Sequence, residues 1–237
     1  MEPCLDRFAE DGYARLGLIA TPNEVAELAR EEARFRLPVG YGAADNQTLR
    51  VNIQLCHRSA AVRRFCTGGA QIAPVVRLLG PDVCLTHQQF VTKLPDGPDE
   101  RSDIPMHQDN GYGRLEPTTD VTIWMPLVDT DERNGCLWIV PGSHQAGLLE
   151  HGPAGVNPVL REATTEREAV PLPLEAGHAV AFTGLTLHGS GPNHTEAARP
   201  ALFVRYCDPR AVMIGNDEDD HRPVIEDAHS WVVAGEA

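Results

Sequence analysis

The sequence is nearly devoid of lysine: Lys93 is the only one, beside 19 arginines. It also has no apolar run near the roughly 20 residues that a membrane-spanning helix requires. The first residues, MEPCLDRFAEDG, carry acids early and lack the apolar core of a signal peptide. The six cysteines form no C-x-x-C pair, and we expect them to be reduced, buried side chains. These absences predict a soluble, cytoplasmic protein without a membrane partner, and the arginine bias indicates a GC-rich bacterial source.

Positive charge is scarce as well, because 34 acidic residues face 20 basic ones and leave a net charge of -14 at pH 7. A protein that binds a nucleic-acid backbone needs a basic face. The composition therefore argues against nucleic acid as a partner. Part of the acidic excess is local, in GNDEDDHRP at 215–223, where we expect an exposed loop.

The N-terminal third has helical patterns. Thr21, Pro22 and Glu24 fit a capping box with proline at the first helical position, which predicts the start of a helix. A second helical stretch follows Ser59, is interrupted by a Gly-Gly pair, and ends at Gly80.

From residue 81 to 210 the sequence is typical of short strands. Alternating or β-branched segments, separated by turn residues, include VCLTHQQFVTKL, VTIWMPLV, CLWIV, AVPLPL, HAVAFTGLTLHG and PALFVRY. The gaps lack helical crossovers, so the strands should pair antiparallel in a sandwich or barrel. We predict one α+β, mainly β domain over 1–237, with a helical part at 1–80, the strand core at 81–210 and a C-terminal extension at 211–237. The long segment 144–168 fits no strand and is typical of a lid or binding loop.

A metal site is indicated by His107 and Asp109 in IPMHQDNGYG. Chance placement alone gives about 1.4 His-x-Asp/Glu triplets in this composition, so the triplet needs support from elsewhere in the chain. A facial triad for non-haem Fe(II) requires a second histidine and leaves coordination positions open for cosubstrate and oxygen. His188 fits, because it ends the strand-like segment AVAFTGLTLH.

A carboxylate-binding site is indicated by Arg199, which begins the strand that follows His188. Neighbouring antiparallel strands bring such residues side by side near the mouth of a barrel. Arginine fixes a carboxylate through two parallel hydrogen bonds, and Ser190 can supply another donor.

Several segments in order resemble the phytanoyl-CoA dioxygenase (PhyH) superfamily of Fe(II)/2-oxoglutarate-dependent oxygenases. They are FAEDGYARL, HQDNGYG, WMPLVDTDERNGCLWIVPGSH and LHGSGPNHTEAARPALFVRY. The resemblance runs over nearly the whole chain and implies a double-stranded β-helix (jelly-roll, cupin-like) core with N-terminal helices packed on one sheet. The compact chain looks like bacterial members that tailor natural products, including those that close orthoester rings in oligosaccharide antibiotics.

The resemblance implies that His107, Asp109 and His188 bind iron. It further implies that Arg199 and Ser190 hold the distal carboxylate of 2-oxoglutarate. The implied reaction consumes O2 and 2-oxoglutarate, releases succinate and CO2, and oxidises a C–H bond of a small-molecule substrate.

Three more residues resemble cosubstrate contacts of the family or lie beside them: Lys93, Trp124 and Gln89, the last on the same strand face as Lys93. The carboxylate ligand also bears on the reaction. Related halogenases lack it, so Asp109 predicts hydroxylation, desaturation or oxidative ring closure, and antibiotic biosynthesis as the setting.

The substrate pocket is expected to include Arg50, Asn52 and Gln54 in LRVNIQL, together with Tyr112 and the 144–168 segment. This set predicts a small polar or glycosylated metabolite. The lack of a basic cluster argues against an acyl-CoA, whose phosphates would require several Lys or Arg. The substrate, the oxidised carbon and the oligomeric state are left open by the sequence.

Two alternatives fit parts of the pattern. A cupin-like, zinc-dependent isomerase or hydrolase would share the fold, but such sites generally use more histidine and do not need Arg199. A non-catalytic binding module would keep the fold without a complete ligand set. The second triplet, His194-Thr195-Glu196, lies in a turn and is expected to be exposed, and His144 is expected to order a turn.

Overall fold

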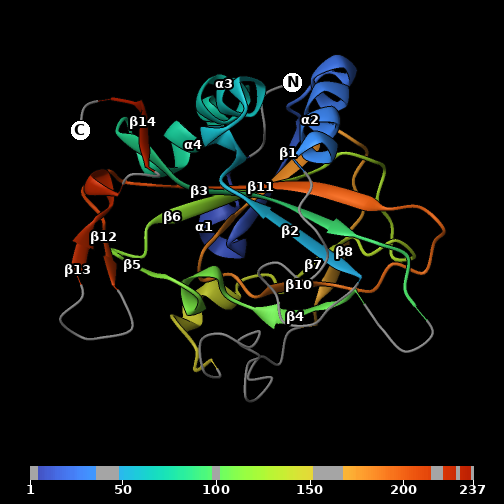
Figure 1. The fold of residues 1–237 in the computed structure, drawn as a ribbon. Helices are drawn as coiled ribbons and strands as arrows, with labels where there is room; N and C mark the ends of the chain where they lie inside the picture. Colours follow the sequence, from blue (N-terminus) through green and yellow to red (C-terminus); the bar gives the residue numbers. More distant parts are fainter. Residues whose placement is uncertain are drawn as a thin grey trace.

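The computed structural model describes residues 5–35, 48–97, 102–151, 168–214, 221–227 and 230–235. Two antiparallel sheets face each other, and helices cover the outer side of the larger one (Figure 1). This arrangement confirms the predicted α+β, mainly β chain with a jelly-roll core and helices packed on one sheet. Most of the expected binding loop at 144–168 and of the acidic run at 215–223 lies outside the described residues. In the described part of the chain, no helix combines the length and hydropathy needed to cross a membrane.

The larger sheet consists, within the described residues, of β1 (Tyr13–Leu18), β2 (Leu49–Ile53), β3 (Val83–Lys93), β6 (Asp120–Pro126), β9 (His178–Thr183), β11 (Arg199–Cys207) and β14 (Trp231–Ala234). The strands follow the order β1-β9-β6-β11-β3-β14, and β2 also pairs with β3. Every residue of the central strand β6 is buried, including the polar Asp120 and Thr122, so both faces of this strand are covered.

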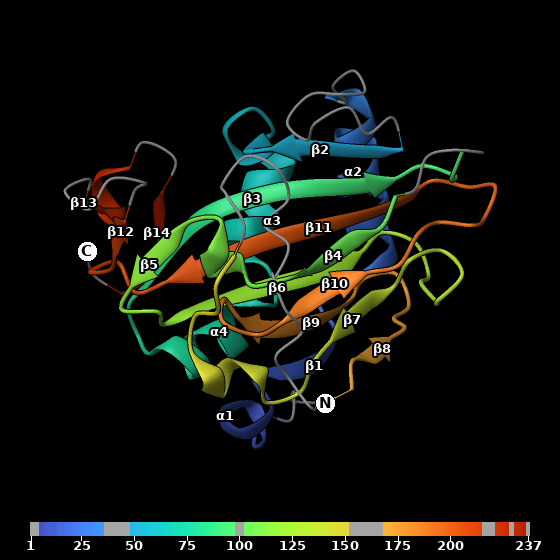
Figure 2. The same ribbon diagram turned by 90° about the horizontal axis from the view of Figure 1, so that it is seen from below.

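The smaller sheet pairs β4 (Ile104–His107), β10 (His188–Ser190), β7 (Leu137–Ile139) and β8 (Val170–Leu172) in that order. Seen from below, these strands lie across the face of the larger sheet (Figure 2). A third, small sheet at one end of the molecule pairs β13 (His221–Pro223), β12 (Val212–Ile214) and β5 (Arg114–Glu116).

The helices are α1 (Phe8–Asp11), α2 (Pro22–Arg34), α3 (Ala60–Gly68) and α4 (Ile72–Leu79), with short 3-10 turns η1 (Leu55–His57), η2 (Asp109–Gly111), η3 (Ser143–Ala146) and η4 (Val224–Glu226). The predicted capping box is present: the Thr21 hydroxyl accepts from the Glu24 N–H, and the Glu24 carboxylate accepts from the Thr21 N–H at 2.8 Å. Ser59 caps α3 and Gly80 ends α4, as predicted. Apolar residues of α2, α3 and α4 pack with strands β3, β6 and β11 in the main core.

The prediction of a helical part at 1–80 missed two strands of the larger sheet, β1 and β2. Their partners lie far away in sequence: Tyr13 pairs with Phe182, and Leu49 pairs with Lys93. Strands of five or six residues carry a weak local signal, and long-range pairing decides their conformation. The C-terminal extension is likewise part of this sheet, since β14 pairs with β3.

Candidate metal centre

The two histidines lie on adjacent strands of the smaller sheet. β4 ends at His107, β10 begins at His188, and these two residues are direct partners across the antiparallel pair. Gly189 permits this approach, because a Cβ there would meet the backbone oxygen of Ile104 at 2.8 Å and the backbone nitrogen of Met106 at 3.2 Å. The tight contact between β4 and β10 therefore positions both imidazoles above the larger sheet.

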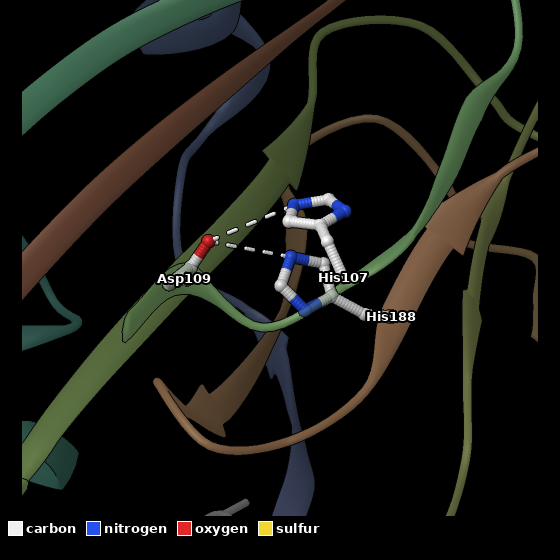
Figure 3. Close-up of side chains that lie close together, drawn as sticks. All are labelled: His107, Asp109 and His188. Carbon is white, nitrogen blue, oxygen red and sulfur yellow. Dashed lines mark ion pairs between the residues drawn. The ribbon is translucent and has the colours of Figure 1, made fainter. Parts of the chain in front are cut away.

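The three expected ligands converge. The Nε2 atoms of His188 and His107 lie 3.5 and 3.9 Å from Oδ1 of Asp109 (Figure 3). The two imidazole centroids are 4.3 Å apart. One ligand atom from each side chain lies within 4.8 Å of the others, and this is the single such group of three among the described residues. Side chains from β10 and from the end of β4 thus lie close enough to share one ion.

Each imidazole is oriented by a backbone carbonyl. His107 Nδ1 lies 2.8 Å from the carbonyl oxygen of Pro105, and His188 Nδ1 lies 2.9 Å from that of Thr186. A carbonyl can only accept, so each Nδ1 donates its proton there, and each Nε2 is the ring nitrogen turned toward Asp109. Metal-binding histidines are commonly held in this way.

Asp109 is oriented by one hydroxyl group from β6. The Thr122 hydroxyl donates to Oδ2 at 2.7 Å, which leaves Oδ1 directed toward the two histidines. Burial opposes ionisation, but His188, Arg205 and His107 hold the pKa of Asp109 well below its usual range. Burial, and next the neighbouring His188, lowers the pKa of His107 to about 4. An ionised carboxylate and an unprotonated imidazole nitrogen are the forms in which these side chains bind a divalent metal, and the two shifts favour them at Asp109 and His107.

The loop that carries Asp109 is held by an ionic network that sequence reasoning missed. Arg205 on β11 donates to the Asp120 carboxylate at 2.7 Å, to the Asn110 side-chain oxygen at 2.8 Å and to the Gly113 carbonyl at 3.0 Å. Asn110 in turn donates to Asp120 at 2.8 Å. Both charges are buried and paired, which fixes the turn η2 against the sheet. The sequence signal was a second arginine near the end of β11, after the apolar run Ala201–Val204.

The metal ligands open into one cavity of about 580 Å³ between the sheets. Arg199 and Ser190 line it, together with Trp124 and Gln89. The Arg199 guanidinium lies 5.6 Å from the ring centre of Trp124, within the range of a cation–π contact. Arg199 is 1% exposed, and its Nε and one terminal nitrogen have no hydrogen-bond partner among the described residues. Burial lowers its pKa to about 10, so it remains charged at neutral pH.

Lys93 is not among the residues that line this cavity. Its Nζ donates to the backbone carbonyls of Ser102, Ser190 and Gly191, at 2.5, 3.3 and 2.6 Å, and burial lowers the pKa of this group to about 6. The expected direct contact with 2-oxoglutarate is not part of this geometry. Lys93 on β3 instead holds two segments against the larger sheet: the residues just before β4 and the end of β10.

The expected substrate residues on β2 are partly wrong. Leu49, Val51 and Ile53 line the cavity, whereas Arg50 and Asn52 do not. The Asn52 amide instead donates to the Phe35 carbonyl at 2.8 Å. Successive side chains of a strand point to opposite faces, so Arg50 and Asn52 share one face of β2. The pairing of β2 with β3 determines that this face is turned away from the cavity. Gln54 and Tyr112 do line the cavity, as predicted.

The remaining histidine predictions concern residues away from this cavity. His194 and Glu196 are exposed, as expected of the chance triplet, and His194 pairs with Asp96 at 3.1 Å. His144 is the second residue of η3, and its Nε2 lies 3.2 Å from the carbonyl oxygen of Ala9. This position agrees with a role in ordering a turn.

Comparison with known proteins places this geometry in context. The family model described as Phytanoyl-CoA dioxygenase (PhyH) matches residues 8–201. The peroxisomal phytanoyl-CoA dioxygenases of Rattus norvegicus and Homo sapiens are 29% and 27% identical over 78% and 79% of this chain. The chain spans 58% and 59% of the length of these two curated relatives.

Solved structures share the fold. The epimerase SnoN in complex with Fe3+, alpha ketoglutarate and nogalamycin RO superposes with a TM-score of 0.77, at 24% identity, over 92% of this chain and 84% of that one. The alpha ketoglutarate dependent carbocyclase SnoK from nogalamycin biosynthesis gives a TM-score of 0.75, at 22% identity, over 95% and 87%. At such identities the likeness establishes the jelly-roll fold and not the reaction.

Proposed function

This chain belongs to the phytanoyl-CoA dioxygenase (PhyH) family of Fe(II)/2-oxoglutarate-dependent oxygenases, and on that premise we propose its reaction. It oxidises a C–H bond of a small metabolite of the natural-product type, while 2-oxoglutarate and O2 are converted to succinate and CO2. The observation that carries the proposal is the presence, in one cavity, of a two-histidine, one-carboxylate cluster and a buried arginine with free donors.

The donor set fits Fe(II). Two neutral imidazoles and one carboxylate on one side of an ion form the facial triad, which leaves the opposite positions for cosubstrate and oxygen. When bound, the iron supplies the activation of O2. The chain's own contribution is to fix the ligands: Pro105 and Thr186 hold the imidazoles, and Thr122 holds the carboxylate.

The Arg199 guanidinium fits the distal carboxylate of 2-oxoglutarate. A buried cation with two unpaired nitrogens is unfavourable until an anion reaches it, and a carboxylate supplies two acceptors in matching geometry. Trp124 covers the guanidinium, and Ser190, on β10 of the smaller sheet, lines the same cavity and can supply a further donor. Together these residues orient the cosubstrate toward the three metal ligands.

Asp109 bears on the outcome of the reaction. With Asp109 as a ligand, the carboxylate would take the coordination position that a halide would need, so hydroxylation, desaturation or oxidative ring closure is proposed. SnoN and SnoK are named as an epimerase and a carbocyclase, so one fold accommodates several outcomes.

The test is anaerobic addition of Fe(II) and 2-oxoglutarate to the metal-free protein. A weak visible absorption band at about 500 nm, characteristic of 2-oxoglutarate chelated to Fe(II), is expected for the wild type and not for His107→Ala. O2-dependent release of succinate, stimulated by a substrate from a metabolite screen, completes the assignment. Turnover that proceeds with Zn(II) and without O2 would instead identify an isomerase or hydrolase.

A further inference from the structure

We propose that the substrate is an uncharged ring system with a flat apolar face, and that β2 supplies the surface on which this face packs. The proposal rests on the proposed oxygenase reaction for the place where oxidation occurs, but not for the binding of the ring system itself. It replaces the polar or glycosylated substrate that the sequence suggested, because two of the polar residues behind that idea point away from the cavity.

The apolar surface is a strip along one face of β2. Leu49, Val51 and Ile53 line the cavity at alternate positions. Four residue steps of about 3.4 Å make this strip roughly 14 Å long. Its register places Leu49 level with Lys93 and Ile53 level with Gln89, so the strip runs from the depth of Arg199 outward. A surface of this length suits several fused rings better than one small polar molecule.

Apolar side chains also lie at the opening of the cavity. Ile53 on β2 is 46% exposed and Tyr112 after η2 is 50% exposed, although both are large and line the cavity. The Tyr112 ring meets the His107 ring edge-on, with centroids 5.2 Å apart, which places the phenol beside the metal ligands. Large apolar groups left exposed at a cavity mouth are typical of a site that buries an apolar ligand.

The hydrogen-bonding side chains of the wall near β2 include Gln54, Thr86 and Gln89. The Gln89 side-chain oxygen lies 3.3 Å from His87 Nε2, which holds the amide in place. Within the described residues its NH2 group has no hydrogen-bond partner, and Gln89 lines the same cavity. One donor of this kind suits a ketone or hydroxyl on a ring, and it fixes orientation without requiring a charge.

Among the described residues that line the cavity, no arginine or lysine is left over for an anionic substrate. The cavity's two arginines within the described residues are Arg199 and Arg205. The first is assigned to 2-oxoglutarate, and the second is paired with Asp120 and Asn110. A phosphate or carboxylate on the substrate would therefore enter without a partner, at a large cost in desolvation.

The experiment measures binding without turnover, using protein loaded with Co(II) and 2-oxoglutarate under exclusion of O2. Four probes are titrated by calorimetry: dihydroxyanthraquinone as the uncharged ring system, methyl glucoside, glucose phosphate and a cationic acridine. We expect the anthraquinone alone to bind at micromolar concentration, with a negative heat-capacity change from apolar burial.

Variants on the two faces of β2 provide a matched comparison. Val51→Ser should weaken anthraquinone binding by about tenfold, since it removes most of one buried apolar contact, and Ile53→Ser should act similarly. Arg50→Ser, one position away on the opposite face, should change binding by less than about twofold. Circular dichroism and thermal melting of each variant establish that it is folded.

The proposal is overturned if the sugar, its phosphate or the cation binds more tightly than the anthraquinone, or if no probe binds. It is equally overturned if Arg50→Ser weakens binding while Val51→Ser and Ile53→Ser do not. Failure of the oxygenase proposal is distinguishable: the anthraquinone would bind with the predicted variant effects, while no added compound stimulates O2-dependent succinate release in the iron-loaded protein.

Discussion

The hydroxyl of Thr122 should control metal affinity without touching the metal. It donates to Asp109 Oδ2 at 2.7 Å from the middle of β6, where it is fully buried. Thr122→Val keeps the branched shape and removes only the donor. The aspartate would then lose the contact that keeps Oδ1 turned toward the histidines.

The magnitude follows from the charge of the acceptor. A hydrogen bond to an ionised group contributes about 1.5–3 kcal/mol, which corresponds to a weakening of metal binding by roughly 10- to 150-fold. Loss of a residue that orients a metal ligand typically costs 10–100-fold in affinity, about the same range. We therefore expect the Kd for Co(II) or Mn(II) to rise by about one to two orders of magnitude.

The assay is anaerobic equilibrium titration of the metal-free protein, with Thr130→Val as a control. Thr130 is also buried and its hydroxyl donates to a backbone carbonyl, that of Leu174 at 3.1 Å, but it does not line the cavity. The control should lower thermal stability without altering metal affinity. An unchanged Kd in folded Thr122→Val, or an equal loss in the control, would refute the role assigned to this hydroxyl.

Three further outcomes are expected. Gly189→Ala should push β4 away from β10, because the added Cβ would lie 2.8 Å from a backbone oxygen. The variant should melt several degrees lower and bind Co(II) more weakly, and a wild-type melting curve would contradict this. Arg199→Met should raise the KM for 2-oxoglutarate by about 100-fold or more, yet leave the metal-free protein at least as stable, because an unpaired buried charge is removed; a marked loss of stability contradicts it. The pKa of His107 is depressed to about 4, so the unfolded chain binds this proton at a higher pH than the folded protein does. The metal-free protein should therefore lose stability as the pH falls from 6.5 toward 4. Denaturant titrations at each pH measure the free energy of unfolding, which should depend less on pH in His107→Gln.

Features that depend on neighbouring residues were predictable from the sequence. The capping box at Thr21 and Glu24 depends on contacts three positions apart, and it formed as expected. The motif segments placed His107, Asp109 and His188 in a recognisable order, and the structure brings them together. Arg199 was predicted from its place at the start of a strand, and its unpaired nitrogens fit that prediction.

Which face a strand shows, and what its polar residues meet, was decided only by the tertiary structure. The alternation in β2 is legible in the sequence, but pairing with β3 determined that Val51 and not Asn52 faces the cavity. The same is true of Arg205, whose partners Asp120 and Asn110 lie 85 and 95 positions away. Local patterns set what a segment can form, whereas register and side-chain partners arise from contacts between distant segments, and these exist only once the chain has folded.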